Sequence, residues 1–131
     1  FPASGGRIIT GLELVAIETQ SASERSVGEV LSAPTIPIAK LTGFENHAGQ
    51  TGFLEDLQPL GHVSVGNGNG LGSRVDGLVT DQIVATYMHG PAFVRNPELA
   101  DWFLSRKLGE LSPISDAIFT QLHDERVDRL N

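Results

Sequence analysis

Apolar residues in the first two thirds of the chain alternate with polar residues or form short runs, and Gly, Pro, Asn and Ser separate these runs. This pattern is typical of strands connected by turns. The sequence therefore predicts strands at residues 14–19, 27–32, 38–46, 62–66, 77–80 and 83–88.

The third predicted strand has two different faces. Two sets of side chains alternate along it, Leu41, Gly43 and Glu45 on one face and Thr42, Phe44 and Asn46 on the other. Since successive side chains of a strand point to opposite faces, we expect one face to be buried and the other to face a cleft.

The last third of the chain has the pattern of helices. Asn96, Pro97 and Glu98 predict a helix start, with Asn as the N-cap, Pro at the first helical position and Glu favoured by the helix dipole. Apolar side chains then fall on one stripe up to Gly109, which is placed to end the helix.

A second helix is predicted from Pro113, because apolar residues recur there at spacings of three and four. Its charged end, residues 124–131, is expected to fray. Strands followed by terminal helices predict an α/β domain. No repeat or linker divides the chain, so residues 1–131 are expected to form a single domain or part of one.

Composition excludes several classes of function. Nine Lys and Arg against 16 Asp and Glu give a net charge of −7, and such a surface repels phosphate backbones and anionic lipid. Nucleic acid is therefore not an expected partner. No apolar run approaches the roughly 20 residues that span a bilayer. Residues 1–10 do not resemble a secretory signal, so a cytoplasmic location is expected.

His89 is the first candidate for chemistry. It stands where a mostly apolar strand ends and a Gly-Pro turn begins. Strand ends in α/β proteins meet the ligand crevice, and imidazole side chains can take a proton from a nucleophile and return it to a leaving group. The same position also suits a histidine that only makes a hydrogen bond at a strand end.

Glu45, Asn46 and His47 form a second cluster, which one strand delivers to one turn. Glu45 and His47 share a face, and a carboxylate beside an imidazole suggests an acid/base pair or two metal ligands. The histidines lack the tight spacing of a metal site, so no metal is expected. The alternative is that these polar groups tie a tight turn together.

Residues 66–72 are the most glycine-dense stretch of the chain. Backbone N–H groups in such a loop can cradle a phosphate. However, the loop has neither a Gly-Lys-Ser/Thr motif nor a helix directly after it, and Asn-Gly pairs adopt left-handed conformations easily. A hairpin connection is therefore the preferred interpretation.

Arg25 precedes a predicted strand in an otherwise acidic chain. Its fixed fork of donors suits a carboxylate ligand, such as the α-carboxylate of an amino acid. The alternative is a surface arginine that pairs with Glu24 or Glu29.

Taken in order, these residues resemble the C-terminal half of a class I glutamine amidotransferase domain of the cobyric acid synthase type. The resemblance spans most of residues 11–108, and its main motifs are Gly43-Phe44-Glu45-Asn46-His47, Gly66-Asn67-Gly68-Asn69 and Tyr87-Met88-His89-Gly90-Pro91. The first two motifs look closer to the cell-wall branch of the family, the glutaminase subunits of lipid II isoglutaminyl synthase.

The resemblance implies a flavodoxin-like mixed sheet with flanking helices, whose N-terminal half is missing from this chain. It implies that His89 activates a cysteine for attack on L-glutamine, that Arg25 holds this substrate, and that Glu45, Asn46 and His47 are active-site neighbours. The chain has no Cys, so the nucleophile is expected in the missing half and the fragment alone is expected to be inactive.

The resemblance also implies a heterodimer, in which ammonia passes to a Mur-ligase-like synthetase subunit. ATP is expected on that subunit, together with the acidic member of the catalytic triad, and the chain itself is expected to need no cofactor. Two alternatives are a glutaminase of the corrinoid-amidating branch and a non-catalytic interaction module with the same fold.

Overall fold

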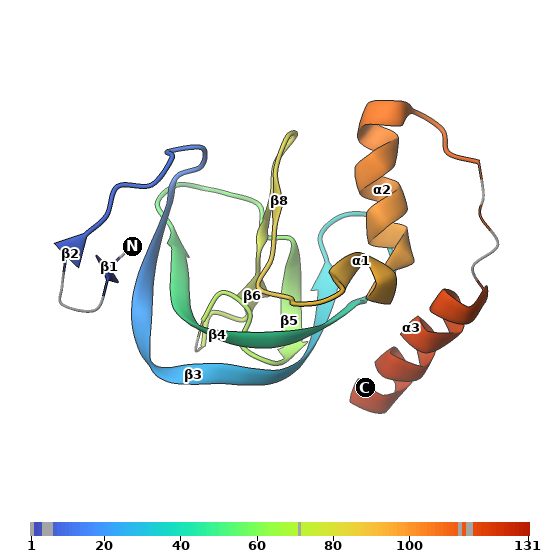
Figure 1. Cartoon of the computed structure of the whole chain (residues 1–131), viewed down its shortest axis with the longest axis horizontal. Coiled ribbons are helices and arrows are strands. Elements are labelled where there is room, and N and C mark those ends of the chain that lie inside the picture. The colour runs from blue at the N-terminus through green and yellow to red at the C-terminus, as the bar shows by residue number, and fades with distance from the viewer. Residues whose placement is uncertain (1, 4–6, 71, 113, 115–116) are drawn as a thin grey trace.

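The computed structural model describes residues 2–3, 7–70, 72–112, 114 and 117–131 (Figure 1). Within these residues the strands form a four-stranded sheet of order β4-β3-β5-β6 and the two-stranded sheets β1-β2 and β7-β8, and every pairing is antiparallel. The strands are β1 (Pro2–Ala3), β2 (Arg7–Ile8), β3 (Ile17–Pro34), β4 (Leu41–Phe53), β5 (Gly61–Val65), β6 (Val75–Asp76), β7 (Leu78–Val79) and β8 (Val84–Ala85).

The first two predicted strands are the two ends of one long strand, β3. The polar residues between them interrupt the alternation but not the pairing, because β4 runs alongside β3 over nearly its whole length. The register shifts between Ser21, opposite Gly49, and Ser26, opposite His47. Residues 22–25 therefore form an irregular bulge opposite the single residue Ala48, and such bulges re-aim side chains.

The buried face predicted for β4 is confirmed, whereas the cleft expected on the other face stays a prediction. Leu41, Gly43, Glu45 and His47 are buried, whereas Phe44 and Asn46 are exposed. The side chains of β4 and its neighbours build the core with residues of the later segments. One packed cluster of buried apolar side chains in this core consists of Val30, Leu41, Leu60, Val63, Val79, Met88 and Leu99.

The helices α1 (Ala92–Arg95), α2 (Pro97–Leu108) and α3 (Ala117–Leu130) lie together at one end of the strands (Figure 1). The predicted bounds of α2 are confirmed, from Asn96 at its N-cap to Gly109 at its C-cap.

The capping role predicted for the Asn96 side chain is wrong. Its Oδ1 accepts a hydrogen bond from the Thr42 backbone N–H at 2.7 Å, and its Nδ2 donates to the Thr42 carbonyl at 2.8 Å. This buried amide therefore satisfies the backbone of β4 instead of the helix, which also explains why Thr42 is buried on the exposed face of that strand.

The predicted start of the second helix, Pro113, lies outside the described residues. Its far end continues as helix to Leu130 and does not fray as expected. The Lys40 ammonium donates to the Asn131 side-chain oxygen at 2.6 Å and holds this end against the start of β4.

The α/β class is thus confirmed, but all strand pairs among the described residues are antiparallel instead of forming the mixed sheet expected. The flavodoxin-like arrangement and the missing N-terminal half stay predictions. None of the described helices is long and apolar enough to span a bilayer.

Candidate functional site

His89 is held by its main chain at the free edge of β4. Its backbone N–H donates to the Phe44 carbonyl at 2.7 Å, and the two residues form an isolated antiparallel bridge. The preceding residue, Met88, lies so close to β4 that a Cβ on Gly43 would stand 2.5 Å from its Cγ. The imidazole itself is exposed, so a fixed backbone presents a side chain that a substrate can reach.

The segment before His89 is anchored by Asp76 of β6. The Asp76 carboxylate is buried and accepts hydrogen bonds from the Tyr87 backbone N–H at 3.1 Å and from the Thr86 hydroxyl. Burial raises the pKa of Asp76, while the bonds from Thr86 and Tyr87 act in the opposite direction. Residues 86–88 are consequently placed by this side chain and not by a regular strand.

Tyr87 adds a second anchor between this segment and β4. Its ring stacks on His47 with centroids 3.9 Å apart, and its hydroxyl lies 2.7 Å from the Thr51 hydroxyl. A Cβ on Gly49 would lie 2.6 Å from the tyrosine hydroxyl oxygen, so only glycine leaves room for the ring. The residues of β4 therefore fix the position at which the segment that leads to His89 packs against this strand.

The glycine-dense loop binds an anion, but the anion is the buried carboxylate of Glu45. The backbone N–H groups of Asn67 and Gly68 each donate to one oxygen of this carboxylate at 2.9 Å. The loop connects the antiparallel strands β5 and β6, which confirms the hairpin interpretation. Gly68 has a φ of +58°, and a Cβ there would lie 2.4 Å from the Val75 carbonyl oxygen.

Glu45 and His47 share a face, as predicted, and both are buried. The His47 Nε2 lies 3.4 Å from a Glu45 oxygen, and its Nδ1 lies 3.0 Å from the Gly49 carbonyl oxygen. Within the part of the chain that the structure describes, no group of His, Asp or Glu side chains could hold a metal ion. The predicted turn is wrong, because β4 continues through these residues to Phe53. The contacts of Glu45 instead tie β4 to the glycine-dense loop.

Arg25 lies in the bulge of β3 and reaches across to Asn46. Its Nε donates to the Asn46 Oδ1 at 2.5 Å and its Nη2 donates to the Asn46 carbonyl at 3.2 Å. The alternative pairing with Glu29 is wrong, because Glu29 binds Arg95 at 2.5 Å and Arg126 at 3.3 Å. Among the described residues, Arg25 makes no ion pair, with Glu24 or any other acid.

The structure divides the five predicted site residues into two groups. Arg25, Asn46 and His89 are exposed, and β4 connects them, because His89 is fixed at Phe44 and Arg25 at Asn46. Positions two apart on a strand are about 7 Å apart. Glu45 and His47 lie buried on the opposite face of the same strand.

Sequence reasoning missed Asp76 and Asn69. Asn69 exchanges hydrogen bonds with the backbone of Gly77, at 2.6 Å to the Gly77 N–H and 3.2 Å to its carbonyl, and so fixes the chain next to Asp76. A lone aspartate between Val75 and Gly77 was the available signal, because an acid inside an apolar segment needs buried donors.

A sequence model of the CobB/CobQ-like glutamine amidotransferase domain matches residues 3–97, which include all five predicted site residues. The chain belongs to this family. The family resemblance inferred from the motifs is therefore confirmed.

This amidotransferase-family chain is similar in sequence to three proteins of known name. Subunit GatD of the glutamine-hydrolysing lipid II isoglutaminyl synthase from Staphylococcus aureus is 32% identical over 101 residues, 77% of this chain and 40% of that protein. The GatD subunit from Streptococcus pneumoniae is 33% identical over 101 residues, 76% of this chain and 39% of that protein. Cobyric acid synthase from a Thermoanaerobacter species is 29% identical over 136 residues, 93% of this chain and 26% of that protein. The chain spans about two fifths of the length of the two GatD subunits.

Proposed function

We propose that this chain is the histidine-bearing part of a glutaminase that supplies ammonia for amidation of D-glutamate in a peptidoglycan precursor. Family membership and the identity of 32% and 33% to two GatD subunits support this role. The observation that carries it is an exposed imidazole, His89, whose main chain is fixed at Phe44 of β4, the strand on which Asn46 binds Arg25.

In this proposal a cysteine thiol supplied by sequence outside these residues loses its proton to the imidazole of His89. The thiolate attacks the side-chain amide carbon of glutamine, and the tetrahedral intermediate collapses to a thioester as the departing nitrogen takes a proton from the imidazolium. Ammonia leaves, and water hydrolyses the thioester to glutamate and the free thiol. An exposed ring on an anchored backbone suits this shuttling of one proton.

Arg25 is the proposed site for the α-carboxylate of glutamine. An arginine presents five N–H donors in a planar fork that matches a carboxylate. Two hydrogen bonds to Asn46 occupy part of this fork, so donors stay free for a ligand. The carboxylate end and the amide end of the substrate would then lie along the exposed face of β4.

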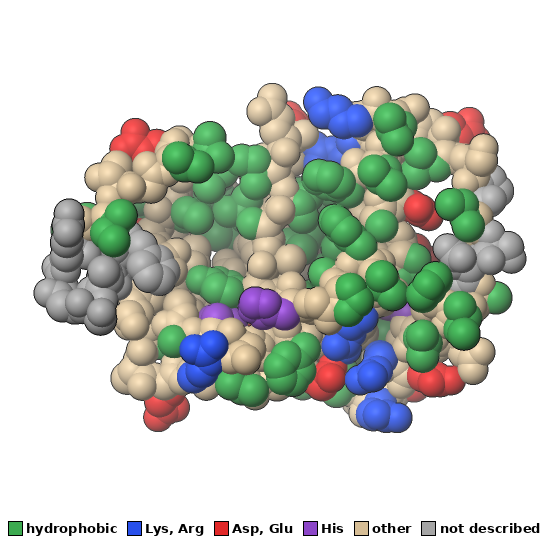
Figure 2. Space-filling model, viewed as in Figure 1, with side chains coloured by type: hydrophobic (Ala, Val, Ile, Leu, Met, Phe, Trp, Pro, Cys, Tyr) green, Lys and Arg blue, Asp and Glu red, His purple; other side chains and the backbone are tan. Residues whose placement is uncertain are grey.

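The proposal includes further protein packed against this chain. Large apolar side chains are exposed on α1 and α2, and Figure 2 shows hydrophobic atoms gathered over one face of the molecule, above histidine atoms at its centre. Contiguous apolar surface of this kind supports an interface. The nucleophile-bearing segment and a Mur-ligase-like, ATP-binding synthetase that contributes the acidic triad member are the proposed occupants, in the cytoplasm.

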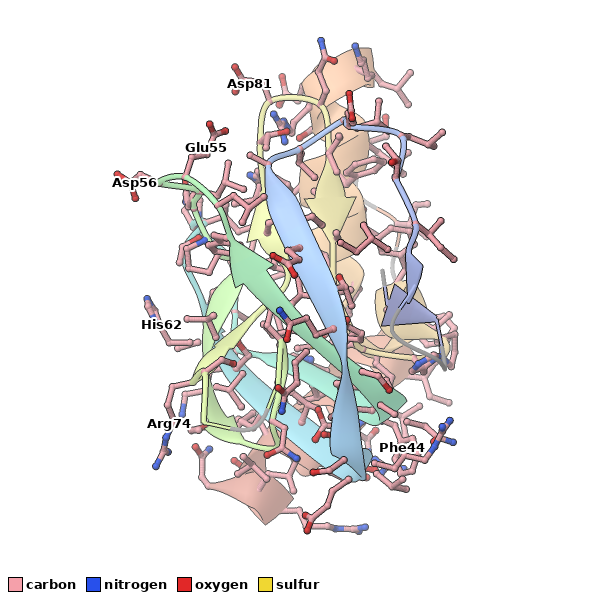
Figure 3. All side chains as sticks on the ribbon, turned by 90° about the vertical axis from the view of Figure 1, so that its left-hand side faces the viewer. Phe44, Glu55, Asp56, His62, Arg74 and Asp81 are labelled. Carbon is pink, nitrogen blue, oxygen red and sulfur yellow. The ribbon has the colours of Figure 1, made fainter. Side chains whose placement is uncertain are left out.

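The test is ammonia release from L-glutamine by the full-length gene product together with its synthetase partner. His89→Ala is expected to lower the rate about 10²- to 10⁴-fold, as loss of a general base does. His62→Ala is the matched control, because His62 is exposed on β5, and Figure 3 shows it on the opposite side of the molecule from Phe44, the residue that binds the His89 backbone. Equal rates for wild type and His89→Ala would exclude this role.

A corrinoid acceptor is the second candidate, since a cobyric acid synthase matches 93% of the chain, a larger share than either GatD subunit does. Amidation assays with lipid II and with a corrinoid acid separate the two. No ammonia release by the wild-type complex would instead favour a non-catalytic interaction module.

A further inference from the structure

Arg25 owes its position to an irregular stretch of β3. Residues 22–25 are opposed only by Ala48, so the strand bends away from regular pairing just before Ser26. Ser26 is buried, and its hydroxyl accepts a hydrogen bond from the Asn67 side chain at 3.2 Å. The end of the bulge is thereby tied to the glycine-dense loop, and Arg25 is directed toward Asn46.

The partner of Arg25 is an uncharged amide. Asn46 binds the guanidinium through its side-chain oxygen at 2.5 Å and through its backbone carbonyl at 3.2 Å. These bonds restrain the long side chain, yet they leave its positive charge unneutralised. An aspartate at this position would hold the arginine equally well but would cancel the charge that attracts a carboxylate ligand.

Two acids that the strand register brings near Arg25, Glu29 and Glu45, are bound by other groups. Glu29 lies opposite Phe44 and is bound by Arg95 and Arg126 from the helices. Glu45, next to Asn46 along β4, points to the buried face and is bound by backbone N–H groups of the glycine-dense loop. The carboxylates of Glu29 and Glu45 are thus held by other donors, and the neighbouring Glu24 makes no ion pair with Arg25 among the described residues.

We propose that Asn46 is a positioning residue, which fixes the Arg25 guanidinium for the α-carboxylate of glutamine while leaving it charged. This inference rests on the proposed glutaminase function. Asn46 lies two residues along β4 from Phe44, where the His89 backbone is anchored. The strand therefore also sets the spacing between Arg25, which would bind the α-carboxylate, and His89, which would transfer the proton.

The test uses steady-state ammonia release by the full-length complex. Asn46→Asp is expected to raise KM for L-glutamine about tenfold or more, because the new carboxylate occupies the guanidinium, and to change kcat by less than about twofold. Asn46→Ala frees Arg25 without neutralising it and is expected to raise KM by less. Gln82→Glu adds the same charge on an exposed turn and is expected to leave both constants unchanged.

A substrate without the α-carboxylate separates positioning from general damage. Wild type should prefer L-glutamine strongly over L-glutamine α-amide, and Asn46→Asp should lose most of this preference. An unchanged KM in Asn46→Asp, or a fall in kcat alone, overturns the role of Asn46 while leaving the glutaminase proposal intact. A wild-type complex that releases no ammonia refutes both.

Discussion

The contact between Gly43 and Met88 gives a sharp test of how β4 positions His89. A Cβ added to Gly43 would stand 2.5 Å from the Met88 Cγ, 2.6 Å from its Cβ and 2.9 Å from its sulfur. The Met88 Cβ is bonded directly to the backbone, so rotation of the side chain alone cannot relieve the clash. Gly43→Ala should therefore push the chain that carries His89 away from β4.

Overpacking of this kind typically costs about 1–3 kcal/mol. Met88→Ala should cost about 2–5 kcal/mol by itself, because Met88 belongs to the buried core. Met88→Ala removes the Cγ and sulfur contacts but keeps the Met88 Cβ, 2.6 Å away, so only part of the clash in Gly43→Ala is relieved. The double variant should thus be more stable than the sum of the two single effects predicts, by about 1 kcal/mol or more.

The assay is urea unfolding of the full-length protein, combined with ammonia release by the complex. Gly52→Ala is the matched control, because Gly52 lies on the same strand and a Cβ there would meet nothing within 4 Å. Gly43→Ala should lose activity more than Gly52→Ala does. Strict additivity of the two single effects, or a Gly43→Ala variant as stable as Gly52→Ala, would refute the reasoning.

Three further predictions concern the buried polar contacts. Tyr87→Phe removes the hydroxyl that contacts Thr51 and keeps the ring stacked, so unfolding should become easier by about 0.5–1.5 kcal/mol. Glu45→Gln removes the charge that the loop N–H groups bind and should cost about 1–3 kcal/mol in urea unfolding, whereas the exposed Glu55→Gln should cost almost nothing. The raised pKa of Asp76 means that the folded state binds its proton more tightly than the unfolded state, so this residue should lower stability as pH rises from the ordinary aspartate pKa through the raised one. Asp76→Asn should flatten that part of the profile of unfolding free energy against pH.

These predictions fail in distinct ways. A Tyr87→Phe protein with wild-type stability would mean that the hydroxyl contact with Thr51 contributes nothing beyond the ring stack. Equal losses in Glu45→Gln and Glu55→Gln would mean that the loop does not depend on the buried charge. A wild-type profile parallel to that of Asp76→Asn would contradict the direction of the pKa shift.

Local pattern was enough to predict the elements whose character is set by neighbouring residues. The alternation along β4 gave its buried and exposed faces, and Pro97 and Gly109 marked the ends of α2. The prediction failed where polar residues interrupt the alternation within β3. The pattern predicts a gap between strands at residues 20–26, because only the pairing with β4 shows that one strand continues through them.

The sequence pattern predicts a histidine at a strand end and an arginine before a strand, and both placements are wrong. Arg25 lies inside β3, and His89 forms an isolated bridge with Phe44 after β8 has ended. Which partner each polar group takes was decided by tertiary structure. The Asn96 amide serves β4 instead of its own helix, and the loop expected to be a hairpin also holds the Glu45 carboxylate.

The sequence predicts some features and not others because the interactions behind them act over different distances along the chain. Side-chain direction in a strand and the termination of a helix depend on residues a few positions away, so the sequence alone determines them. Glu29 binding to Arg95 and Arg25 binding to Asn46 depend on strand register and on how the helices return to the sheet. Only the folded chain therefore decides that Arg25 is bound by an uncharged amide and not by a carboxylate.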